Sequence, residues 1–509
     1  MKKPSAAACS AKAEGLLAEK WRLLPEFLHA RGLVKQHIKS YDHLISVELQ
    51  KILEANREVR SEHSPSFFVK YTKIRIGRPE FKEESGVTND TITPMECRTR
   101  NLTYSAPIYV SVHYSTQGAK RGRQVRVAND VVIGNIPIML RSKHCVLAGK
   151  SDGELAKIKE CPFDPGGYFV IKGHEKVVLV QEQLSRNRIL VELDENKCTT
   201  AQVVSATHER KSLSRIIQKK GALYLKNNIF VSDIPIFIAM KALGVESDQE
   251  VVSLIGPESE LQDRLDASLR ESAITHGVHT QVQAQRWIGG QLRPGRGRSF
   301  KRSKVDEARE VMNSVILPHV PVISYDFRDK AIYVGLMVRR CLLAMNDARH
   351  LSDKDYYGNK RLELAGGLLS LLFEDLFKNF NSKVKGYVDK VLSKPNRAMA
   401  EVDVPRILGQ FQDTITNGFG HHLATGNWSL KRFRMEQKGV TETVQRLSYI
   451  ASLGHMTRIR SHVEKTRKLS GPRALQPSQW GLVCPSDTPE GDQCGLVKVS
   501  FNFIFHDII

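Results

Sequence analysis

Residues 480–498 of the 509-residue chain read Trp-Gly-Leu-Val-Cys-Pro-Ser-Asp-Thr-Pro-Glu-Gly-Asp-Gln-Cys-Gly-Leu-Val-Lys. Two of the chain's eight cysteines, Cys484 and Cys494, lie in this stretch. No pair of cysteines has the C-x-x-C spacing of common zinc sites, and no Cys/His cluster offers four ligands. We therefore predict no bound metal and no disulfide, with thiols that stay reduced as in the cytosol or nucleus.

The segment just before this stretch is strongly basic. Residues 431–473 contain eleven Lys and Arg against three Glu, a net charge of +8 over 43 residues. Most of the basic residues fall into two clusters, 431–438 and 458–473. The clusters are separated by four apolar residues, Val444, Leu447, Ile450 and Leu453. Two basic loops joined by a packed element predict a two-pronged contact with a phosphate backbone, without base reading. The alternative is a pair of solvated basic turns.

The whole chain shares this basic character. Its 76 Lys and Arg outnumber 55 Asp and Glu, giving a net charge of +21 and a pI near 9.6. This excess predicts a polyanionic partner, and the alternative is a basic face that docks on acidic proteins. Residues 364–373 are too short an apolar run to span a bilayer, and residues 1–13 lack the leucine-rich core of a signal peptide. We expect a soluble intracellular protein of about three domains.

Hydrophobic periodicity predicts a mixture of helices and strands in the first 180 residues. Ser40 is expected to cap a helix whose apolar side chains recur at helical spacing from Leu44 to Leu53. Four segments are predicted as strands from their alternation or short apolar runs: 69–76, 108–112, 131–133 and 168–171. Residues 1–18, which are polar and rich in alanine, are expected to form a frayed tail.

Three later segments carry specific expectations. Residues 286–304 contain seven basic residues, no acid and five Gly or Pro. This composition predicts an exposed basic loop that either touches nucleic acid or is solvated. Residues 362–377 are apolar over most of a helical circumference and predict a buried helix. We expect a break between structural segments at residues 416–418.

Several catalytic chemistries lack their sequence signatures. There is no G-x-x-x-x-G-K-[ST], no strand leading into G-x-G-x-x-G, and no G-x-S-x-G. His174 and Glu175 lack the second His of a zinc-protease helix. Asp353 and Asp355 form a D-x-D pair of the kind that holds Mg²⁺. Because Lys354 lies between them, we favour a solvated loop with balanced charges.

Residues 480–498 closely resemble the fork region of the second-largest, β-like subunits of cellular RNA polymerases. The order Cys-Pro, Thr-Pro-Glu-Gly and Gly-Leu is specific to that family, and the resemblance covers nearly the whole chain. Residues 244–250, 428–433 and 464–473 are most similar to the eukaryotic polymerase III branch. The resemblance implies an α+β multidomain fold, the N-terminal half of such a subunit. The implied parts are a flexible tail (1–18), the protrusion (19–184), the lobe (185–346), a return segment of the protrusion (347–415), the fork (416–498) and a divergent tail (499–509).

The resemblance also implies roles for individual residues. Four residues match fork loop 1, beside the RNA–DNA hybrid: Lys431, Arg432, Arg434 and Lys438. Three match fork loop 2, near the separating downstream duplex: Lys465, Arg467 and Lys468. Arg473 and Glu490 match positions near the active centre that help to organise the surroundings of the incoming nucleotide.

The assembly implied by the resemblance is a nuclear, DNA-directed RNA polymerase. Its partners for this chain are the largest and other polymerase subunits, the DNA template and the RNA–DNA hybrid, with no membrane. The resemblance places Mg²⁺ mainly on the largest subunit, so this chain is expected to bind no cofactor and to hold no complete catalytic site. We expect the isolated chain to be inactive, because it has no carboxylate cluster for two metal ions.

Some features depart from the family pattern. The hybrid-binding, wall and anchor regions of the family follow the part that this chain resembles. After Lys498 the family usually continues Asn-Leu, whereas this chain continues with an apolar tail of high β-propensity. Gln493 replaces a residue that is usually small. The alternative function is a non-catalytic truncated fragment that binds nucleic acid or takes part in assembly.

Overall fold

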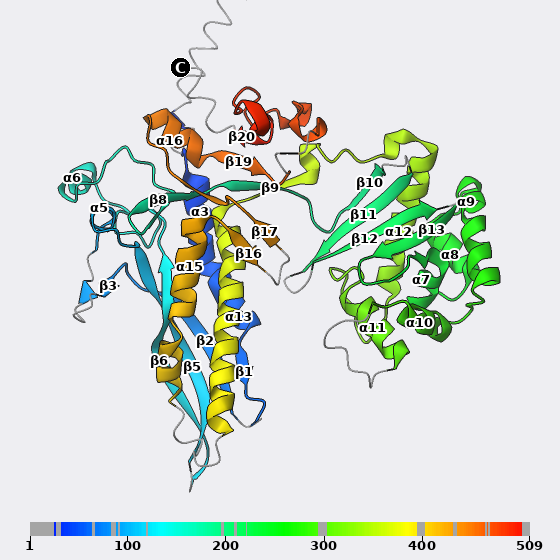
Figure 1. Cartoon of the computed structure of the whole chain (residues 1–509), viewed down its shortest axis with the longest axis horizontal. Helices are drawn as coiled ribbons and strands as arrows, with labels where there is room; N and C mark the ends of the chain where they lie inside the picture. Colours follow the sequence, from blue (N-terminus) through cyan, green and yellow to red (C-terminus); the bar gives the residue numbers. More distant parts are fainter. Residues whose placement is uncertain are drawn as a thin grey trace, which may run out of the picture. The chain divides into compact units, whose positions relative to one another are not determined.

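The computed structural model divides the chain into two compact units, which we describe separately (Figure 1). The first unit comprises Met1–Gln183, Leu362–Leu430 and Met435–Ile509, and the second comprises Leu184–Arg361 and Lys431–Arg434. The structure describes residues 25–26, 32–63, 67–82, 88–89, 92–118, 121–194, 198–207, 211–219, 221–293, 303–393, 403–430, 435–463, 466 and 469–500. Helices and several separate sheets make up these residues, which confirms the predicted α+β class. The tail predicted at 1–18 lies outside them.

A long antiparallel sheet supports the first unit. Its strands follow the order β1 (Glu58–Arg60), β2 (Phe68–Ile76), β5 (Ser105–Gly118) and β6 (Arg121–Pro137). Alternate side chains point into the core, as the sequence pattern predicted: Val69, Tyr71, Ile108, Val110 and Val112 are buried. The predicted strand at 131–133 is part of β6, where Val131 pairs with Val110.

Helices α13 (Ala365–Leu392), α14 (Val404–Gln410) and α15 (Asp413–Thr425) belong to the first unit, and α13 and α15 run along its long sheet (Figure 1). The helix predicted at 362–377 is confirmed from Ala365 onward and extends to Leu392, whereas its first two residues belong to strand β15 (Lys360–Glu363). The predicted break at 416–418 is wrong, because α15 runs straight through it. A Cβ on Gly418 would lie 2.3 Å from Leu376 Cδ2. The glycine therefore lets two helices approach closely and does not mark a turn.

The N-terminal helical region also differs from the prediction at Ser40. It consists of α3 (Lys35–His43), a π-helical turn η1 (Leu44–Glu48) and α4 (Leu49–Ala55), so Ser40 lies inside a helix. The Ser40 hydroxyl instead accepts a hydrogen bond from the backbone N–H of Gly366, at 3.1 Å. Ser40 thus satisfies a free N–H in the first turn of α13, a helix more than 300 residues away.

C-terminal strands complete sheets begun by N-terminal strands in the first unit. Strand β18 (Thr441–Thr443) pairs with β8 (His174–Val178), which pairs with β7 (Phe169–Ile171). Strand β19 (Arg458–Ser461) runs parallel to β9 (Val180–Leu184) and antiparallel to β20 (Val497–Val499). Val499, the first residue of the predicted divergent tail, is therefore in a strand. Residues 501–509 lie outside the described part of the chain.

Shorter elements complete the first unit. They are β3 (Phe81–Lys82), β4 (Thr88–Asn89), α5 (Pro94–Thr99), α6 (Asp152–Lys157), β16 (Trp428–Leu430), β17 (Met435–Gln437) and α16 (Tyr449–Met456). Helix α16 begins where Ser448 accepts a hydrogen bond from Ala451 N–H. Leu447 just before this helix and Ile450 within it are exposed, so the element predicted to be packed between the basic clusters is packed only through Val444 and Leu453.

The second unit contains a five-stranded antiparallel meander with helices packed around one core. The strands are β10 (Ile189–Leu193), β11 (Thr199–Ala206), β12 (Lys211–Lys219), β13 (Ala222–Asn227) and β14 (Ile234–Pro235). The helices are α7 (Ile236–Ala242), α8 (Asp248–Ile255), α9 (Ser259–Arg270), α10 (Gln281–Gly290), α11 (Lys304–Ser314) and α12 (Arg328–Asn346).

The prediction of a basic loop at 286–304 is wrong at both ends, where the chain is helical. Arg286 lies within α10, and Lys304 begins α11. A Cβ on Gly289 would lie 2.2 Å from the carbonyl oxygen of Lys304, so this glycine allows the two helices to meet. Residues 294–302 lie outside the described part of the chain. Among the described helices, none is both long and apolar enough to cross a membrane.

Candidate nucleic-acid interface

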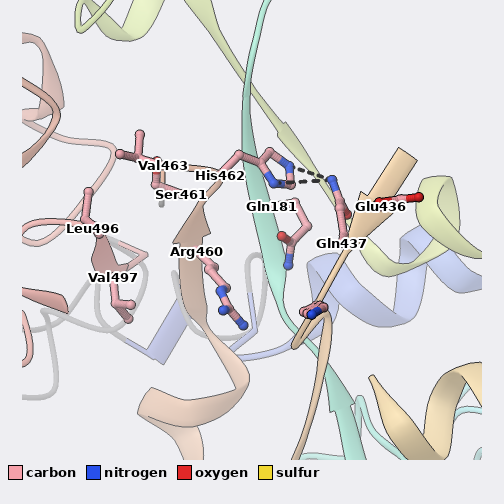
Figure 2. A pocket seen from close by; sticks show the side chains of 10 residues that line it. Gln181, Glu436, Gln437, Arg460, Ser461, His462, Val463, Leu496 and Val497 are labelled. Carbon is pink, nitrogen blue, oxygen red and sulfur yellow. Dashed lines mark hydrogen bonds between the residues drawn. The ribbon is translucent and has the colours of Figure 1, made fainter. Parts of the chain in front are cut away.

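A cavity of about 220 Å³ lies where β9, β17 and β19 of the first unit meet (Figure 2). Arg460 and Ser461 reach it from β19, Gln437 from β17, and buried Gln181 from β9. The other lining residues are Glu436, Lys438, His462, Val463, Leu496 and Val497. The cavity is thus built by segments that are nearly 300 residues apart in sequence.

Local geometry fixes the arginine of this cavity. Arg460 Nη1 donates a hydrogen bond to the carbonyl oxygen of Gly439 at 2.6 Å. Gly439 has φ +71°, and a Cβ there would lie 2.1 Å from Arg460 Nη1. The positive φ of the turn after β17 therefore favours glycine at this position. Across the cavity, the side-chain amide of Gln437 lies 2.8 Å from His462 Nε2 (Figure 2).

One carboxylate beside the cavity is shared by several cationic groups. Gln445 N–H donates to His455 Nδ1 at 3.3 Å, so the ring proton is on Nε2, which lies 3.1 Å from Glu442 Oε2. Glu442 is also 4.0 Å from Arg458 Nη1 and 3.8 Å from Arg460 Nη1. The hydrogen bond with His455 and the nearby arginines lower the pKa of the Glu442 carboxyl. Glu442 therefore stays ionised and orients the basic strand β19.

A second group of charges joins the predicted fork to the N-terminal part of the first unit. Arg98 donates to Glu160 and Glu175, both at 2.8 Å, and to the Tyr168 hydroxyl at 2.9 Å. We call Arg98, Arg446 and their four partners, Glu160, Asp164, Tyr168 and Glu175, the Tyr168 cluster. Burial, followed by the neighbouring Asp164 and Glu175 carboxylates, raises the pKa of the Tyr168 hydroxyl, which therefore keeps its proton.

Arg446 belongs to this cluster although it lies within the basic segment 431–473. Its Nε donates to Glu175 at 2.6 Å, and its Nη2 donates to the Tyr168 hydroxyl at 2.9 Å and to Asp164 at 3.3 Å. The charge of Arg446 is therefore matched inside the unit. The sequence count of eleven basic residues included this arginine, which the structure assigns to internal packing.

Arg473 and Glu490 lie on the turns that precede β20. Arg473 Nη1 donates to the carbonyl oxygens of Asp492 and Cys494, at 2.8 and 3.0 Å. A Cβ on Gly495, where φ is +72°, would lie 2.3 Å from the Arg473 carbonyl oxygen. Glu490 is exposed and precedes the 3₁₀ turn η8 (Gly491–Gln493). Arg473 thus holds the turn that presents Glu490.

The structure locates three of the nine residues that the resemblance singled out: Lys438, Arg473 and Glu490. The other six lie outside the described residues: Lys431, Arg432, Arg434, Lys465, Arg467 and Lys468. Sequence reasoning did not single out Gln437, Arg460 and His462 as site residues. Arg460 was signalled by the basic cluster at 458–473, whereas Gln437 and His462 have no local pattern that would reveal them.

The Asp353–Asp355 pair is part of a charge-balanced loop. Asp353 Oδ1 accepts a hydrogen bond from Asp355 N–H at 2.8 Å, and Lys360 Nζ lies 3.7 Å from Asp355. Lys354 pairs with Glu192. Within the described part of the chain, no group of three or more His, Cys, Asp or Glu is placed to hold a metal ion.

Comparison with known proteins identifies the family of this chain. The family described as RNA polymerase beta subunit matches residues 32–406, and the one described as RNA polymerase Rpb2, domain 3, matches residues 442–499. The chain belongs to the RNA polymerase β-subunit family. These two matches confirm the predicted resemblance and its protrusion, lobe and fork regions.

Individual relatives refine this membership. The chain is 51% identical over 485 residues to the DNA-directed RNA polymerase III subunit RPC2 of Schizosaccharomyces pombe, covering 95% of this chain and 41% of the relative. It is 50% identical over 483 residues to the same subunit of Saccharomyces cerevisiae, covering 94% of this chain and 41% of the relative. It is 34% identical over 480 residues to the DNA-directed RNA polymerase subunit Rpo2N of Methanococcus vannielii, covering 94% of this chain and 93% of the relative.

The polymerase III resemblance is therefore confirmed as well. The chain spans about two fifths of the length of the RPC2 subunits that it matches, but nearly all of the archaeal subunit. A polymerase β-like subunit of about this extent thus exists as a separate polypeptide.

Proposed function

We propose that this chain contributes to a nuclear DNA-directed RNA polymerase III as its second-largest subunit or as part of it. In that role it assembles with the largest and other polymerase subunits during template-dependent RNA synthesis from ribonucleoside triphosphates. Support comes from the family membership and from 50–51% identity to two RPC2 subunits.

Within that role, the surface around the cavity lined by Lys438 and Arg460, which we call the cavity face, binds the phosphate backbones of the DNA template and the RNA–DNA hybrid. One observation carries this assignment: Lys438, from the first basic cluster, and Arg460, from the second, line the same cavity. One cationic residue of each cluster therefore lies at the same cavity, which supports a two-pronged backbone contact. The cavity is smaller than a typical ligand pocket of roughly 300–1,000 Å³, which fits a phosphate group better than a whole small-molecule ligand.

The chemistry of nucleotide addition belongs to the assembled enzyme in this proposal. Two Mg²⁺ ions held mainly by the largest subunit supply the Lewis acid for phosphoryl transfer. Lys438, Arg460 and the six cations of the two fork loops hold phosphates without reading bases. Arg473 positions the turn that carries Glu490 toward the surroundings of the nucleotide. Template-dependent extension by the purified chain alone, with primer and Mg²⁺, would contradict this division of labour.

The phosphate contacts are tested by the salt dependence of binding. We would measure fluorescence anisotropy of two unrelated labelled RNA–DNA hybrids between about 50 and 200 mM salt. Lys438→Gln and Arg460→Gln should each reduce the slope of log affinity against log salt by roughly 0.7 to 0.9, equally for both hybrids. Arg446→Gln is the matched control, because its charge is already paired with Asp164 and Glu175. Unchanged slopes in both test variants, or a slope change in the control alone, would overturn the assignment.

A further inference from the structure

A groove of about 750 Å³ lies in the first unit between strand β1 and helix α13 (Figure 1). Its volume is within the range of roughly 300–1,000 Å³ that is usual for ligand sites. The end of α4 and the whole of β1, residues 54–60, form one wall. The other wall is a single face of α13, whose contributing residues follow the spacing of one helical stripe: Lys378, Asn381, Ser382 and Lys385. We call this site the β1 groove.

Strand β1 lies at an edge of the long sheet, beside β2. Just before β1, the N–H of Tyr71 donates to the carbonyl oxygen of Arg57 at 2.9 Å. Antiparallel strands direct alternate residues at a given neighbour, so the backbone N–H and C=O of Glu58 and Arg60 point away from β2. The β1 groove therefore adjoins the open hydrogen-bonding edge of the sheet.

Side chains of the same chain cover this edge on both sides of β1. On β2, the Gln50 amide donates to the carbonyl oxygen of Thr72 at 3.3 Å and accepts from the N–H of Ile74 at 3.2 Å. Beyond β1, the carboxylate of Asp389 accepts from the N–H of Glu62 at 3.1 Å. The edge is thus covered at its two ends and borders a groove between them, which is the arrangement of a site for an added strand.

The helical wall of the β1 groove presents hydrogen-bond donors. Asn381 Oδ1 accepts from the hydroxyl of buried Tyr71 at 2.9 Å, which fixes the amide and leaves its NH₂ group as a donor on the wall. The groove has a net charge of +2, from four cations and two carboxylates: Arg57, Arg60, Lys378, Lys385, Glu54 and Glu58. Donors and cations together favour carbonyl oxygens and carboxylates as ligands.

The open edge of β1 distinguishes a peptide from a nucleic acid. A peptide backbone offers N–H and C=O groups in alternation, as the edge does, whereas a phosphate backbone would leave the carbonyl oxygens of Glu58 and Arg60 without donors. We propose that the β1 groove binds a short, extended, acidic segment of another protein, which adds to the long sheet as a strand beside β1. The three residues of β1 span about 10 Å, so they pair with about three residues of that segment.

The test is a peptide titration with variants of one residue. The probe is a fluorescein-labelled, end-capped heptapeptide of alternating Glu and Thr, because Thr favours an extended chain. It is titrated against the complete chain by fluorescence anisotropy. Arg60→Pro should raise the Kd roughly tenfold or more, because proline lacks the N–H that points into the groove. The pairing with β2 should persist, since β2 does not use this N–H. Arg60→Gln is the matched control, which loses the charge and keeps the N–H, and should raise the Kd only about two- to threefold.

A modified probe tests the same backbone contact without changing the protein. Methylation of the backbone nitrogens keeps the charge of the peptide but removes its N–H donors. The methylated peptide should bind the wild-type chain roughly tenfold or more weakly than the unmodified peptide. A heptapeptide of alternating Lys and Thr should bind less tightly than the acidic probe, because the groove is cationic.

Several outcomes would overturn the proposal. The first is the absence of acidic-peptide binding up to about 1 mM. Equal effects of Arg60→Pro and Arg60→Gln, or unchanged affinity of the methylated peptide, would show that charge alone holds the probe. A dimer of this chain that Arg60→Pro dissociates would identify a second copy as the occupant. A loss of RNA–DNA hybrid affinity in Arg60→Gln and Asn381→Ala, with the peptide affinity unchanged, would identify nucleic acid instead.

Discussion

The Tyr168 cluster and the cavity face both use arginines of the first unit, but they balance the charge differently. In the cluster, Arg98 and Arg446 meet three carboxylates and a tyrosine hydroxyl. At the cavity, Glu442 is shared by His455, Arg458 and Arg460. Internal carboxylates saturate the first group, whereas cationic charge remains in excess beside the cavity.

A high count of basic residues does not by itself indicate a phosphate-binding surface. A basic residue adds to a phosphate-binding surface to the extent that the carboxylates of its own fold leave its charge unmatched, as Glu442 does at the cavity, where His455, Arg458 and Arg460 share it. The second unit gives an extreme case, since the fully buried Lys330 donates to three backbone carbonyl oxygens, of Met312, Asn313 and Ile316, at 2.7–2.8 Å. Burial lowers the pKa of this ammonium to about 8. Part of the net charge of +21 is therefore used inside the protein.

The largest effect is expected from Arg98→Met in the Tyr168 cluster. The side chain of Glu160 is 5% exposed, and that of Arg98 is 20% exposed. Removing the guanidinium leaves a buried carboxylate without its partner, which should cost about 3–5 kcal/mol of unfolding free energy. Urea unfolding followed by circular dichroism measures this loss. Arg75→Met, which breaks the exposed pair with Asp130, is the control and should leave the midpoint unchanged. Similar losses in both variants would show that the cluster is no more stabilising than a surface pair.

Arg446→Gln should have a smaller effect on stability. This side chain is 42% exposed, and Glu175 keeps its bond to Arg98 when Arg446 is removed. We expect a loss of about 1–2 kcal/mol in the same urea experiment, since solvent screens part of the interaction. The salt slope of hybrid binding should not change. A slope reduced by roughly 0.7 or more would place Arg446 on a phosphate and remove the distinction between the two groups.

Period-two alternation was sufficient to predict the strands at 69–76 and 108–112, because each side chain's face is set by its neighbours in sequence. Ser40, Gly418 and Arg446 were misjudged for the opposite reason. Their partners are Gly366, Leu376 and the carboxylates at 164 and 175, which lie far away in sequence. The cavity likewise depends on the parallel pairing of β19 with β9, which no local pattern encodes. The motif at 480–498 nevertheless predicted the family correctly, because its specificity lies within one short stretch.

Arg473→Ala should loosen one turn without unfolding the unit. It removes the hydrogen bonds to the Asp492 and Cys494 carbonyl oxygens, for an expected loss of about 1 kcal/mol. Amide hydrogen exchange of a peptide covering residues 491–497 should become roughly fivefold faster, while the strands of the long sheet keep their protection. Lys438→Ala is the control for exchange. In an assembled polymerase, Arg473→Ala should slow nucleotide addition more than it weakens template binding. Unchanged exchange would show that Arg473 does not hold this turn.

Glu442→Gln should produce the smallest change. Unlike the other variants, it should strengthen the binding of the RNA–DNA hybrid. The amide oxygen can still accept from His455 Nε2, so the geometry of β18 and α16 is kept. The loss of one negative charge beside Arg458 and Arg460 should strengthen hybrid binding roughly two- to fivefold at about 0.1 M salt. The salt slope should stay the same, because the number of phosphate contacts does not change. Glu58→Gln, at an exposed pair on β1, should leave the affinity unchanged.

The acid side of the stability profile gives an independent check on Glu442. Its pKa in the folded state is lowered by the bond with His455 and by the arginines, so the carboxylate adds stability above its unfolded pKa. That stability is lost as the pH falls through the lower folded value. The difference between wild type and Glu442→Gln in unfolding free energy should therefore be constant near neutral pH and shrink below about pH 4.5. If Glu442→Gln weakened hybrid binding instead, Glu442 would act mainly by orienting Arg460, and the cavity face would depend on its carboxylate as the Tyr168 cluster does.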